Sequence, residues 1–211
     1  MHNPALAARA KLLNTESAFE VLHRARALEA AGRDIVHLEI GQPDFPTPSH
    51  IVDAAFKAVR DGATGYAPTV GIPELRDAVA EYTTASRGVN VTPDHVVITP
   101  GAKPIMFFAL LACVEAGDEV ITPDPGFPIY ESVIRFIGAK PVSLPLREDI
   151  GFRFDVDELR SLVTSKTKML IVNSPGNPTG GVLGDRELSA IAELATEHRF
   201  WVLSDEVYSR L

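Results

Sequence analysis

Short apolar and β-branched runs alternate with helical patterns along most of this 211-residue chain. The strand-like runs are residues 35–40, 96–99, 119–122, 140–144, 169–172 and 201–203, and the helical patterns are residues 16–31, 51–60, 72–86, 102–115, 129–137, 156–163 and 186–198. Strands that alternate with helices at this spacing predict a mostly parallel sheet covered by helices on both faces. We therefore expect an α/β protein, and a hydrophobic content of 45% is enough for a core of ordinary size.

Two of the helix boundaries carry their own signals. The first helical pattern stops at Gly32, which is a suitable C-terminal cap. Asp155 and Glu158 have the spacing of a capping box, which predicts a helix that begins at Val156. A proline-rich loop at residues 41–48 follows the first strand-like run and is a candidate domain boundary.

Composition excludes several classes of function. The formal net charge of −8, without any basic run, disfavours nucleic acid as a partner. The single Cys113 cannot form an internal disulfide, and the N-terminus lacks the apolar core of a signal peptide. The richest apolar stretch is shorter than the roughly 20 residues that span a bilayer. We expect a cytoplasmic protein with neither a nucleic acid nor a membrane as partner.

Two polar motifs follow the last two predicted strands. Residues 173–180 read Asn-Ser-Pro-Gly-Asn-Pro-Thr-Gly, and residues 204–208 read Ser-Asp-Glu-Val-Tyr. Ligands of open α/β sheets bind outside the carboxyl ends of the strands. We therefore expect the Asn177 amide, the Asp205 carboxylate and the Tyr208 phenol at one edge of the sheet.

Each of these polar or aromatic side chains has two interpretations. A carboxylate directly after an apolar strand is partly buried and needs a partner, so Asp205 either pairs with a protonated pyridine nitrogen or caps a helix. Phe127 either stacks on a flat heterocycle or packs in the core, and Tyr208 either donates into the same pocket or packs half-buried. Turn chemistry alone explains the composition of residues 173–180, although a loop of fixed shape can aim Asn177 inward.

Gly101 lies between a strand-like run and a long apolar helical pattern. Backbone N–H groups at the start of such a helix can hold a phosphate. The pattern matches neither a Walker A loop nor a Rossmann fingerprint, because the further glycines are absent. A plain strand-to-helix connector is the alternative, since glycine is common in any tight turn.

Five motifs in this order together resemble the class I/II aminotransferases. They are residues 40–48 (Ile-Gly-Gln-Pro-Asp-Phe-Pro-Thr-Pro), 65–76 (Gly-Tyr-Ala-Pro-Thr-Val-Gly-Ile-Pro-Glu-Leu-Arg), 99–103 (Thr-Pro-Gly-Ala-Lys), 173–180 and 204–208. The resemblance covers nearly the whole chain. It implies a pyridoxal 5'-phosphate enzyme of the aspartate aminotransferase fold that moves an amino group between an amino acid and a 2-oxo acid.

That resemblance also implies a three-layer α/β/α fold with a mostly parallel mixed sheet. Residues 1–47 would form the N-terminal arm and part of the small domain, and residues 48–211 would form the large cofactor-binding domain, incomplete at its C-terminus. The full-length protein would be a homodimer. No metal ligand is expected.

Roles for individual residues follow from the same resemblance. Asp205 would pair with the pyridine nitrogen of the cofactor, and Tyr208 and Asn177 would bind its phenolic oxygen. Phe127 would stack on the face of the ring. Asn177 would also contact the substrate.

Backbone groups of Gly101, Ala102 and Lys103 would hold the phosphate of the cofactor. Tyr66 would reach the phosphate bound by the neighbouring subunit, and Gly41 would bring backbone close to the substrate carboxylate. Lys103 hints at a dicarboxylic substrate, and a solvated lysine is the alternative interpretation.

The lysine that forms the Schiff base lies, in this family, downstream of the motif at residues 204–208. The six lysines of the chain stand at positions 11, 57, 103, 140, 166 and 168 and do not occupy that motif. We therefore expect an N-terminal fragment of a longer enzyme, with no catalytic residue of its own and unable to transaminate by itself.

Two other functions remain open at this stage. A pyridoxal-phosphate-dependent C–S β-lyase would use the same electron sink for elimination. A non-catalytic cofactor-binding domain of a transcription regulator is less favoured, because only 34 residues precede the first strand-like run and they contain no basic helix to enter a DNA groove.

Overall fold

The computed structural model describes residues 5–13 and 17–210, and they form two compact units. The first, here called the sheet unit, comprises Met1–Glu20 and Ala102–Leu211. The second, here called the helical unit, comprises Val21–Gly101. Each unit is described by itself.

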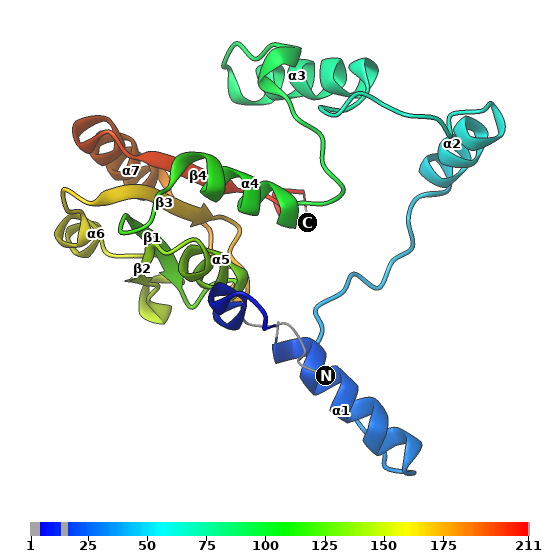
Figure 1. The fold of residues 1–211 in the computed structure, drawn as a ribbon, viewed down its shortest axis with the longest axis horizontal. Helices are drawn as coiled ribbons and strands as arrows, with labels where there is room; N and C mark the ends of the chain where they lie inside the picture. The colour runs from blue at the N-terminus through cyan, green and yellow to red at the C-terminus, as the bar shows by residue number, and fades with distance from the viewer. Residues whose placement is uncertain (1–4, 14–16, 211) are drawn as a thin grey trace. The chain divides into compact units, whose positions relative to one another are not determined.

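The sheet unit is built on four strands that pair in parallel in the order β2-β1-β3-β4 (Figure 1). The strands are β1 (Glu119–Asp124), β2 (Lys140–Pro145), β3 (Thr167–Asn173) and β4 (Trp201–Asp205). Helices connect them: α4 (Lys103–Cys113) precedes β1, and α5 (Ile129–Phe136), α6 (Val156–Leu162) and α7 (Asp185–His198) follow β1, β2 and β3. This arrangement confirms the predicted parallel α/β sheet.

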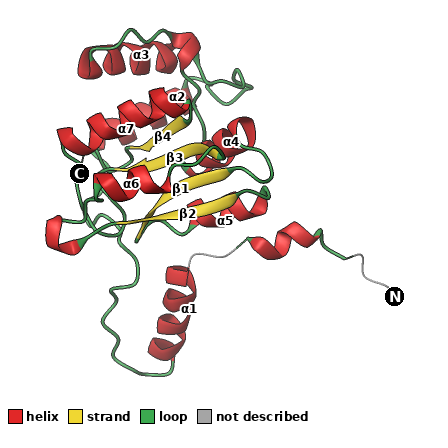
Figure 2. Ribbon diagram, turned by 90° about the vertical axis from the view of Figure 1, so that its left-hand side faces the viewer, coloured by secondary structure: helices red, strands yellow, loops and turns green. Residues whose placement is uncertain are grey.

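Helices cover the sheet on both faces, with α6 and α7 on one side and α4 and α5 on the other (Figure 2). Successive residues of the strands serve opposite faces. Ile121 and Leu170 join the cluster beneath α6 and α7, whereas Val120 and Met169 join the cluster beneath α4 and α5. Both central strands are therefore buried on both sides, as near-continuous apolar strands of a parallel sheet should be.

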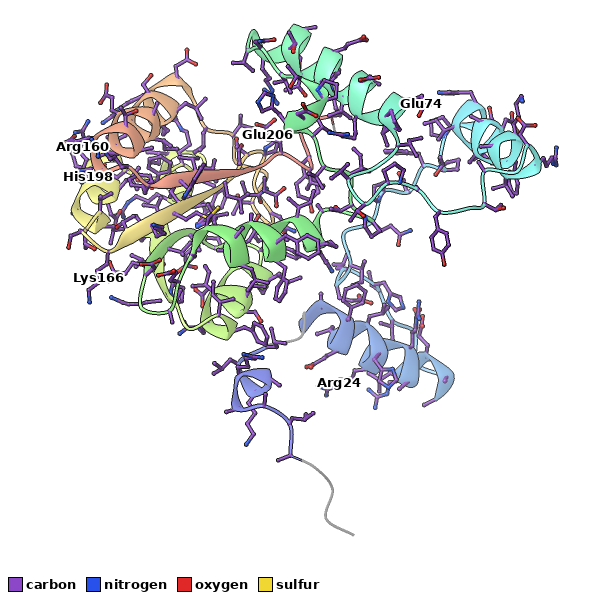
Figure 3. All side chains as sticks on the ribbon, turned by 45° about the horizontal axis from the view of Figure 1, so that its top comes forward. Arg24, Glu74, Arg160, Lys166, His198 and Glu206 are labelled. Carbon is purple, nitrogen blue, oxygen red and sulfur yellow. The ribbon has the colours of Figure 1, made fainter. Side chains whose placement is uncertain are left out.

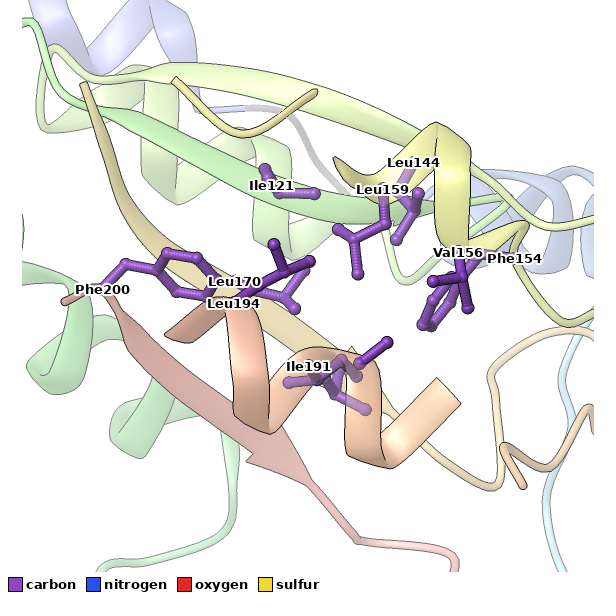
Figure 4. Close-up of a cluster of buried hydrophobic side chains, with 11 residues drawn as sticks. Ile121, Leu144, Phe154, Val156, Leu159, Leu170, Ile191, Leu194 and Phe200 are labelled. Atoms are coloured by element: carbon purple, nitrogen blue, oxygen red, sulfur yellow. The ribbon is translucent and has the colours of Figure 1, made fainter. Parts of the chain in front are cut away.

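The larger hydrophobic cluster packs the inner sides of α6 and α7 against the sheet (Figure 4). Leu159 of α6 and Ile121 of β1 are fully buried, and Ile191 of α7 is 4% exposed. Removing each such side chain from water contributes about 1.5–3 kcal/mol to folding. Packing of this kind, rather than helix propensity, holds the seven-residue α6 in place.

The direction in which the chain crosses the sheet reverses between β1 and β3. From β1 the chain moves outward to β2, and it then returns past β1 to add β3 and β4. Right-handed crossovers in opposite directions place their helices on opposite faces, which matches α5 on one face and α7 on the other. A crevice forms at such a reversal, at the carboxyl ends of the strands.

The helical unit contains α2 (Ser49–Arg60), α3 (Pro73–Arg87) and two further short elements. A 3-10 helix, η2 (Pro93–His95), follows α3, and α1 (Ser17–Ala30) runs into this unit from the sheet unit. The other 3-10 helices, η1 (Ala8–Leu12) and η3 (Glu148–Ile150), belong to the sheet unit. Helix α1 ends as predicted before Gly32, which has a φ of +84°.

Two predicted strands, residues 35–40 and 96–99, are wrong: neither segment forms a strand in the structure. Val36 and Leu38 are 81% and 89% exposed, so the alternating pattern of residues 35–40 buries nothing here. In the second segment the Ile98 N–H donates to the Val70 carbonyl at 2.9 Å. A strand needs a neighbouring strand to complete its hydrogen-bond ladder, and no described strand lies beside either segment.

The remaining predicted elements agree with the structure to within a few residues at each end. The helix predicted at residues 102–115 stops earlier, at Cys113, because Val114 adopts extended backbone angles. Within residues 5–13 and 17–210, we found no helix with the length and apolar character needed to cross a bilayer.

Asp155 caps α6 as the sequence predicts. Its Oδ1 accepts hydrogen bonds from the backbone N–H groups of Asp157 at 2.8 Å and Glu158 at 3.1 Å. The Glu158 N–H first, and then the Asp157 N–H, lower the pKa of the Asp155 carboxyl below its ordinary value. Its contribution to stability is therefore complete above the unfolded-state pKa of about 4 and disappears as the pH falls through the lower folded-state pKa.

We expect Asp155→Ala to lower the melting temperature at about pH 7, and to lower it much less at about pH 3. Thermal denaturation followed by circular dichroism at both pH values measures the difference. Asp155→Asn is the control, because it keeps an oxygen acceptor at the cap without a titrating charge. An equal loss for Asp155→Ala at both pH values would contradict the prediction.

The loop after β1 depends on Gly126. A Cβ atom at this position would clash with the backbone carbonyl oxygen of Pro123, which cannot rotate away as a flexible side chain would. We expect Gly126→Ala to lower the free energy of unfolding by about 1–3 kcal/mol, measured by urea denaturation. Gly65→Ala is the matched control, because its Cβ would meet no atom within 4 Å. Similar losses in the two variants would refute the role of Gly126.

Candidate functional site

Three loops that follow β1, β3 and β4 bring polar and aromatic side chains to the carboxyl edge of the sheet. Asn173 and Asp205, the last residues of β3 and β4, are partners in the strand register. Figure 3 labels Lys166 and His198 near the beginnings of β3 and β4, and Glu206 at the opposite end, after β4. The predicted gathering of these groups at one edge is therefore seen in the backbone itself.

The carboxylate of Asp205 is half-buried and accepts a hydrogen bond on each oxygen. Oδ2 accepts from the Tyr130 hydroxyl at 2.7 Å, and Oδ1 accepts from the Val207 N–H at 3.2 Å. The Val207 contact resembles a helix cap, although only a turn follows β4. Tyr130 of α5 and the Val207 backbone amide are thus the donors described for this carboxylate, and its pairing with a pyridine nitrogen stays a prediction.

Tyr130 is 1% exposed and lies in the core beneath α5. Burial first, and then the negative charge of Asp205, raise the pKa of the Tyr130 hydroxyl above its ordinary value. The hydroxyl therefore keeps its proton and acts as the donor toward Asp205. A buried tyrosine needs a partner for its hydroxyl, and here that partner is a carboxylate of the site.

Asn173 connects the loop after β3 to β4. Its Nδ2 donates to the backbone carbonyl of Asp205 at 3.1 Å, and its Oδ1 accepts from the Asn177 N–H at 2.6 Å. Asn177 in turn donates from Nδ2 to the Tyr208 hydroxyl at 3.2 Å. A continuous set of hydrogen bonds therefore joins the predicted acid, amide and phenol.

Phe127 lies half-buried in the loop between β1 and α5. Its ring meets the Tyr130 ring edge to face, with the centroids 5.7 Å apart and an interplanar angle of 86°. The Lys103 Nζ lies 5.8 Å from the Phe127 ring centroid. Phe127 thus packs against the core and remains partly exposed, which confirms the core interpretation, and stacking on a heterocycle stays a prediction.

Ala102 and Lys103 begin α4, where Ala102 is the N-terminal cap. The first N–H groups of a helix have no acceptor within the helix and face outward with a partial positive charge. Gly101 precedes them with a φ of +92°, a conformation that glycine adopts without strain. It is the last residue of the helical unit, and its N–H donates to the Thr99 carbonyl at 2.8 Å.

Gly41 and Tyr66 belong to the helical unit and are described only within it. Both are exposed, and the Tyr66 side chain is as accessible as in an extended peptide. The structure therefore brings together Asp205, Asn177, Tyr208, Phe127 and the start of α4, and it does not test the positions of Gly41 and Tyr66 relative to that group.

Sequence reasoning missed Tyr130 and Asn173. Tyr130 stands three residues after Phe127, within an apolar helical pattern that predicts a core residue. Asn173 is the first polar residue after an apolar strand, the same signal that identified Asp205. For Tyr130 the only signal was a hydroxyl that would need a partner in the core.

Comparisons with known proteins agree with this geometry. The family model for aminotransferase class I and II matches residues 33–211. A probable aspartate/prephenate aminotransferase of Aquifex aeolicus is 39% identical over 203 residues, which are 96% of this chain and 52% of the relative. A (5-formylfuran-3-yl)methyl phosphate transaminase of Methanocaldococcus jannaschii is 41% identical over 203 residues, 95% of this chain and 52% of the relative.

Solved structures give the same result. The aspartate aminotransferase of Thermus thermophilus with maleate superposes with a TM-score of 0.92 at 39% identity, over 96% of this chain and 53% of that one. The alanine aminotransferase of Pyrococcus furiosus superposes with a TM-score of 0.94 at 33% identity, over 98% of this chain and 53% of that one. This chain thus spans about half the length of these relatives.

Members of this family are pyridoxal phosphate enzymes that act on amino acids and 2-oxo acids. The parallel sheet, the carboxyl-edge site and the family match over most of the chain lead to one conclusion. The chain belongs to the class I and II aminotransferases.

Proposed function

We propose that the protein is a pyridoxal-phosphate-dependent aminotransferase, and that this chain provides the part of the site that holds the cofactor. The observation that carries the proposal is the connected set of Asp205, Asn173, Asn177 and Tyr208 at the carboxyl edge. Because the chain spans about half of its relatives, the activity is proposed for the protein in its natural full length.

The residues at this edge fit the chemistry of pyridoxal phosphate. Its ring has a basic nitrogen, a phenolic oxygen, a flat face and a phosphate. The carboxyl edge offers a matching group for the first three of these. They are a half-buried carboxylate at Asp205, an amide and phenol pair at Asn177 and Tyr208, and the partly exposed ring of Phe127. The start of α4 adds the backbone N–H groups of Ala102 and Lys103 at the positive end of the helix dipole, which suits an anion. The next residue, Pro104, has no N–H, and the Ile105 N–H donates to the Ala102 carbonyl.

Asp205 would hold the ring nitrogen in its protonated form, because a carboxylate that is partly withdrawn from water favours a cationic partner. When bound, pyridoxal phosphate supplies the electron sink that accepts the electron pair released at the substrate α-carbon. Asn177 and Tyr208 would orient the phenolic oxygen, and Asn177 would also face the substrate. Phe127 would exclude water from one face of the ring.

The phosphate would be held at the start of α4 by backbone groups of Gly101, Ala102 and Lys103. We also propose a homodimer, in which the exposed Tyr66 reaches the phosphate bound by the partner. Gly41 would approach the substrate carboxylate with its backbone. The same proposal divides the chain into an arm with part of a small domain at residues 1–47 and a large domain at residues 48–211. It also includes a cytoplasmic location.

Lys103 suggests which donor to test first. It places a cation within 5.8 Å of the Phe127 ring centroid, beside the proposed position of the cofactor. An acidic substrate side chain would find an opposite charge there. The names of the Aquifex aeolicus and Thermus thermophilus relatives, which include aspartate, are consistent with a dicarboxylic donor.

We expect the full-length protein to bind pyridoxal phosphate, and Asp205→Ala to weaken binding roughly 10- to 150-fold. That range corresponds to about 1.5–3 kcal/mol for a hydrogen bond to a charged group. Titration followed by the absorbance of the bound cofactor gives the dissociation constants.

Asp149→Asn is the matched control for this titration. Asp149 is an exposed acid in η3, so its loss should leave the cofactor affinity unchanged. Equal affinity of the parent and Asp205→Ala would remove Asp205 from the cofactor site, and absence of binding by the parent would overturn the proposed function.

With cofactor present, we expect the full-length protein to convert aspartate and 2-oxoglutarate to glutamate with equal formation of the product 2-oxo acid. Alanine should be a poorer donor because it offers no charge to Lys103. Asp205→Ala should lower kcat/KM by about 10²–10³-fold. Coupled assays of 2-oxo acid, ammonia and pyruvate measure these products.

Release of ammonia and pyruvate from a cysteine-type substrate, without amino transfer, would instead identify a C–S β-lyase.

A further inference from the structure

Tyr130 contacts the site from inside the core. It lies in the first turn of α5, is 1% exposed, and meets Asp205, which is 75 positions later in the sequence. The packing of α5 against the sheet therefore fixes where the hydroxyl stands. A hydroxyl fixed in this way offers its partner one defined position.

We propose that Tyr130 is a positioning residue that holds the Asp205 carboxylate in the orientation needed to bind the cofactor ring. The inference rests on the proposed function. Tyr130 acts through Asp205 and does not itself touch the cofactor.

Orientation follows from the distribution of donors. Tyr130 occupies Oδ2 of Asp205 and the Val207 N–H occupies Oδ1, so rotation of the carboxylate would break both hydrogen bonds at once. An ionised carboxylate offers about four lone-pair positions. Two donors therefore fix the group and leave room for a third donor from a ligand.

The hydrogen bond between Tyr130 and Asp205 also has a defined direction, with the Tyr130 hydroxyl as the donor. Burial and the neighbouring carboxylate raise the pKa of the Tyr130 hydroxyl, so Tyr130 remains a donor throughout the neutral range. Tyr130 is thus a neutral donor, and its hydrogen bond brings no opposite charge to the Asp205 carboxylate.

The hydrogen bond to Asp205 also gives the buried Tyr130 hydroxyl the partner that it needs. The test must therefore separate an effect on the orientation of Asp205 from an effect on the stability of the protein. Thr164 offers a matched control at the other end of the sheet. Its hydroxyl donates to the Glu119 carboxylate at 2.7 Å, the length of the Tyr130 contact, and Glu119 begins β1 whereas Asp205 ends β4. Thr164→Val therefore removes a hydrogen bond of the same length to a carboxylate, together with the acceptor of the Lys166 N–H, far from the proposed ring position.

The experiment uses the natural full-length protein with Tyr130→Phe, Asp205→Asn, both substitutions together, and Thr164→Val. Melting temperatures are measured first without cofactor, and all titrations with pyridoxal phosphate are run below the lowest of them. Two readouts are recorded, the dissociation constant and the circular dichroism of the bound cofactor per mole bound.

We expect Tyr130→Phe to weaken cofactor binding about 10-fold and to reduce the circular dichroism of the bound cofactor, because the ring is held less firmly. In the Asp205→Asn background the same substitution should change the affinity less than twofold, since the carboxylate that Tyr130 positions is gone. Thr164→Val should lower the melting temperature and leave both cofactor readouts unchanged.

Three results would overturn the inference. They are unchanged binding and dichroism in Tyr130→Phe, full multiplication of the two losses in the double variant, or equal loss of affinity in Thr164→Val. In each of these cases the parent still binds the cofactor and Asp205→Asn still weakens binding. If the parent itself shows no binding, the proposed function has failed, which is a separate outcome.

Discussion

Burial of the central strands on both faces is the constraint on which the rest of the sheet unit depends. Val120 and Met169 face α4 and α5, while Ile121 and Leu170 face α6 and α7, so the central parts of β1 and β3 are buried on both sides. Each return across the sheet must then be a covering helix, which makes the strands parallel. All carboxyl ends consequently share one edge, and the polar groups that end the strands meet there.

That constraint explains which features could be predicted from the sequence. Strands β1 and β3 read as near-continuous apolar runs because both of their faces are buried, and the alternation of such runs with helical patterns could be recognised from the sequence. Asn177, Asp205 and Tyr208 could be placed together because each follows a strand whose end is set by the sheet. Residues 35–40 and 96–99 have similar local patterns, but a strand also needs a neighbour, and local sequence carries no information about one.

Tyr130 and Asn173 show a different limit of sequence reasoning. Tyr130 lies in the helix predicted at residues 129–137, yet its contact with Asp205 joins positions 75 residues apart. Asn173 similarly connects Asp205 to Asn177 through both ends of its amide. Such contacts are set by how α5 and two strand ends meet in space. Polar residues that follow strand ends are thus easier to predict than the residues that hold them in position.

Two carboxylates at opposite edges of the sheet show how the same group serves structure or chemistry. Glu119 accepts from the Lys140 ammonium at 2.9 Å, and Lys140 first, then Thr164, lower the pKa of its carboxyl. Its charge is thereby compensated by a cation of the protein. The hydrogen bonds described for Asp205 come from a phenol and a backbone amide, which orient the carboxylate without neutralising it. A partly buried anion that accepts only from neutral donors retains its attraction for a cation, which is the property that the proposed pairing with a protonated ring nitrogen would use.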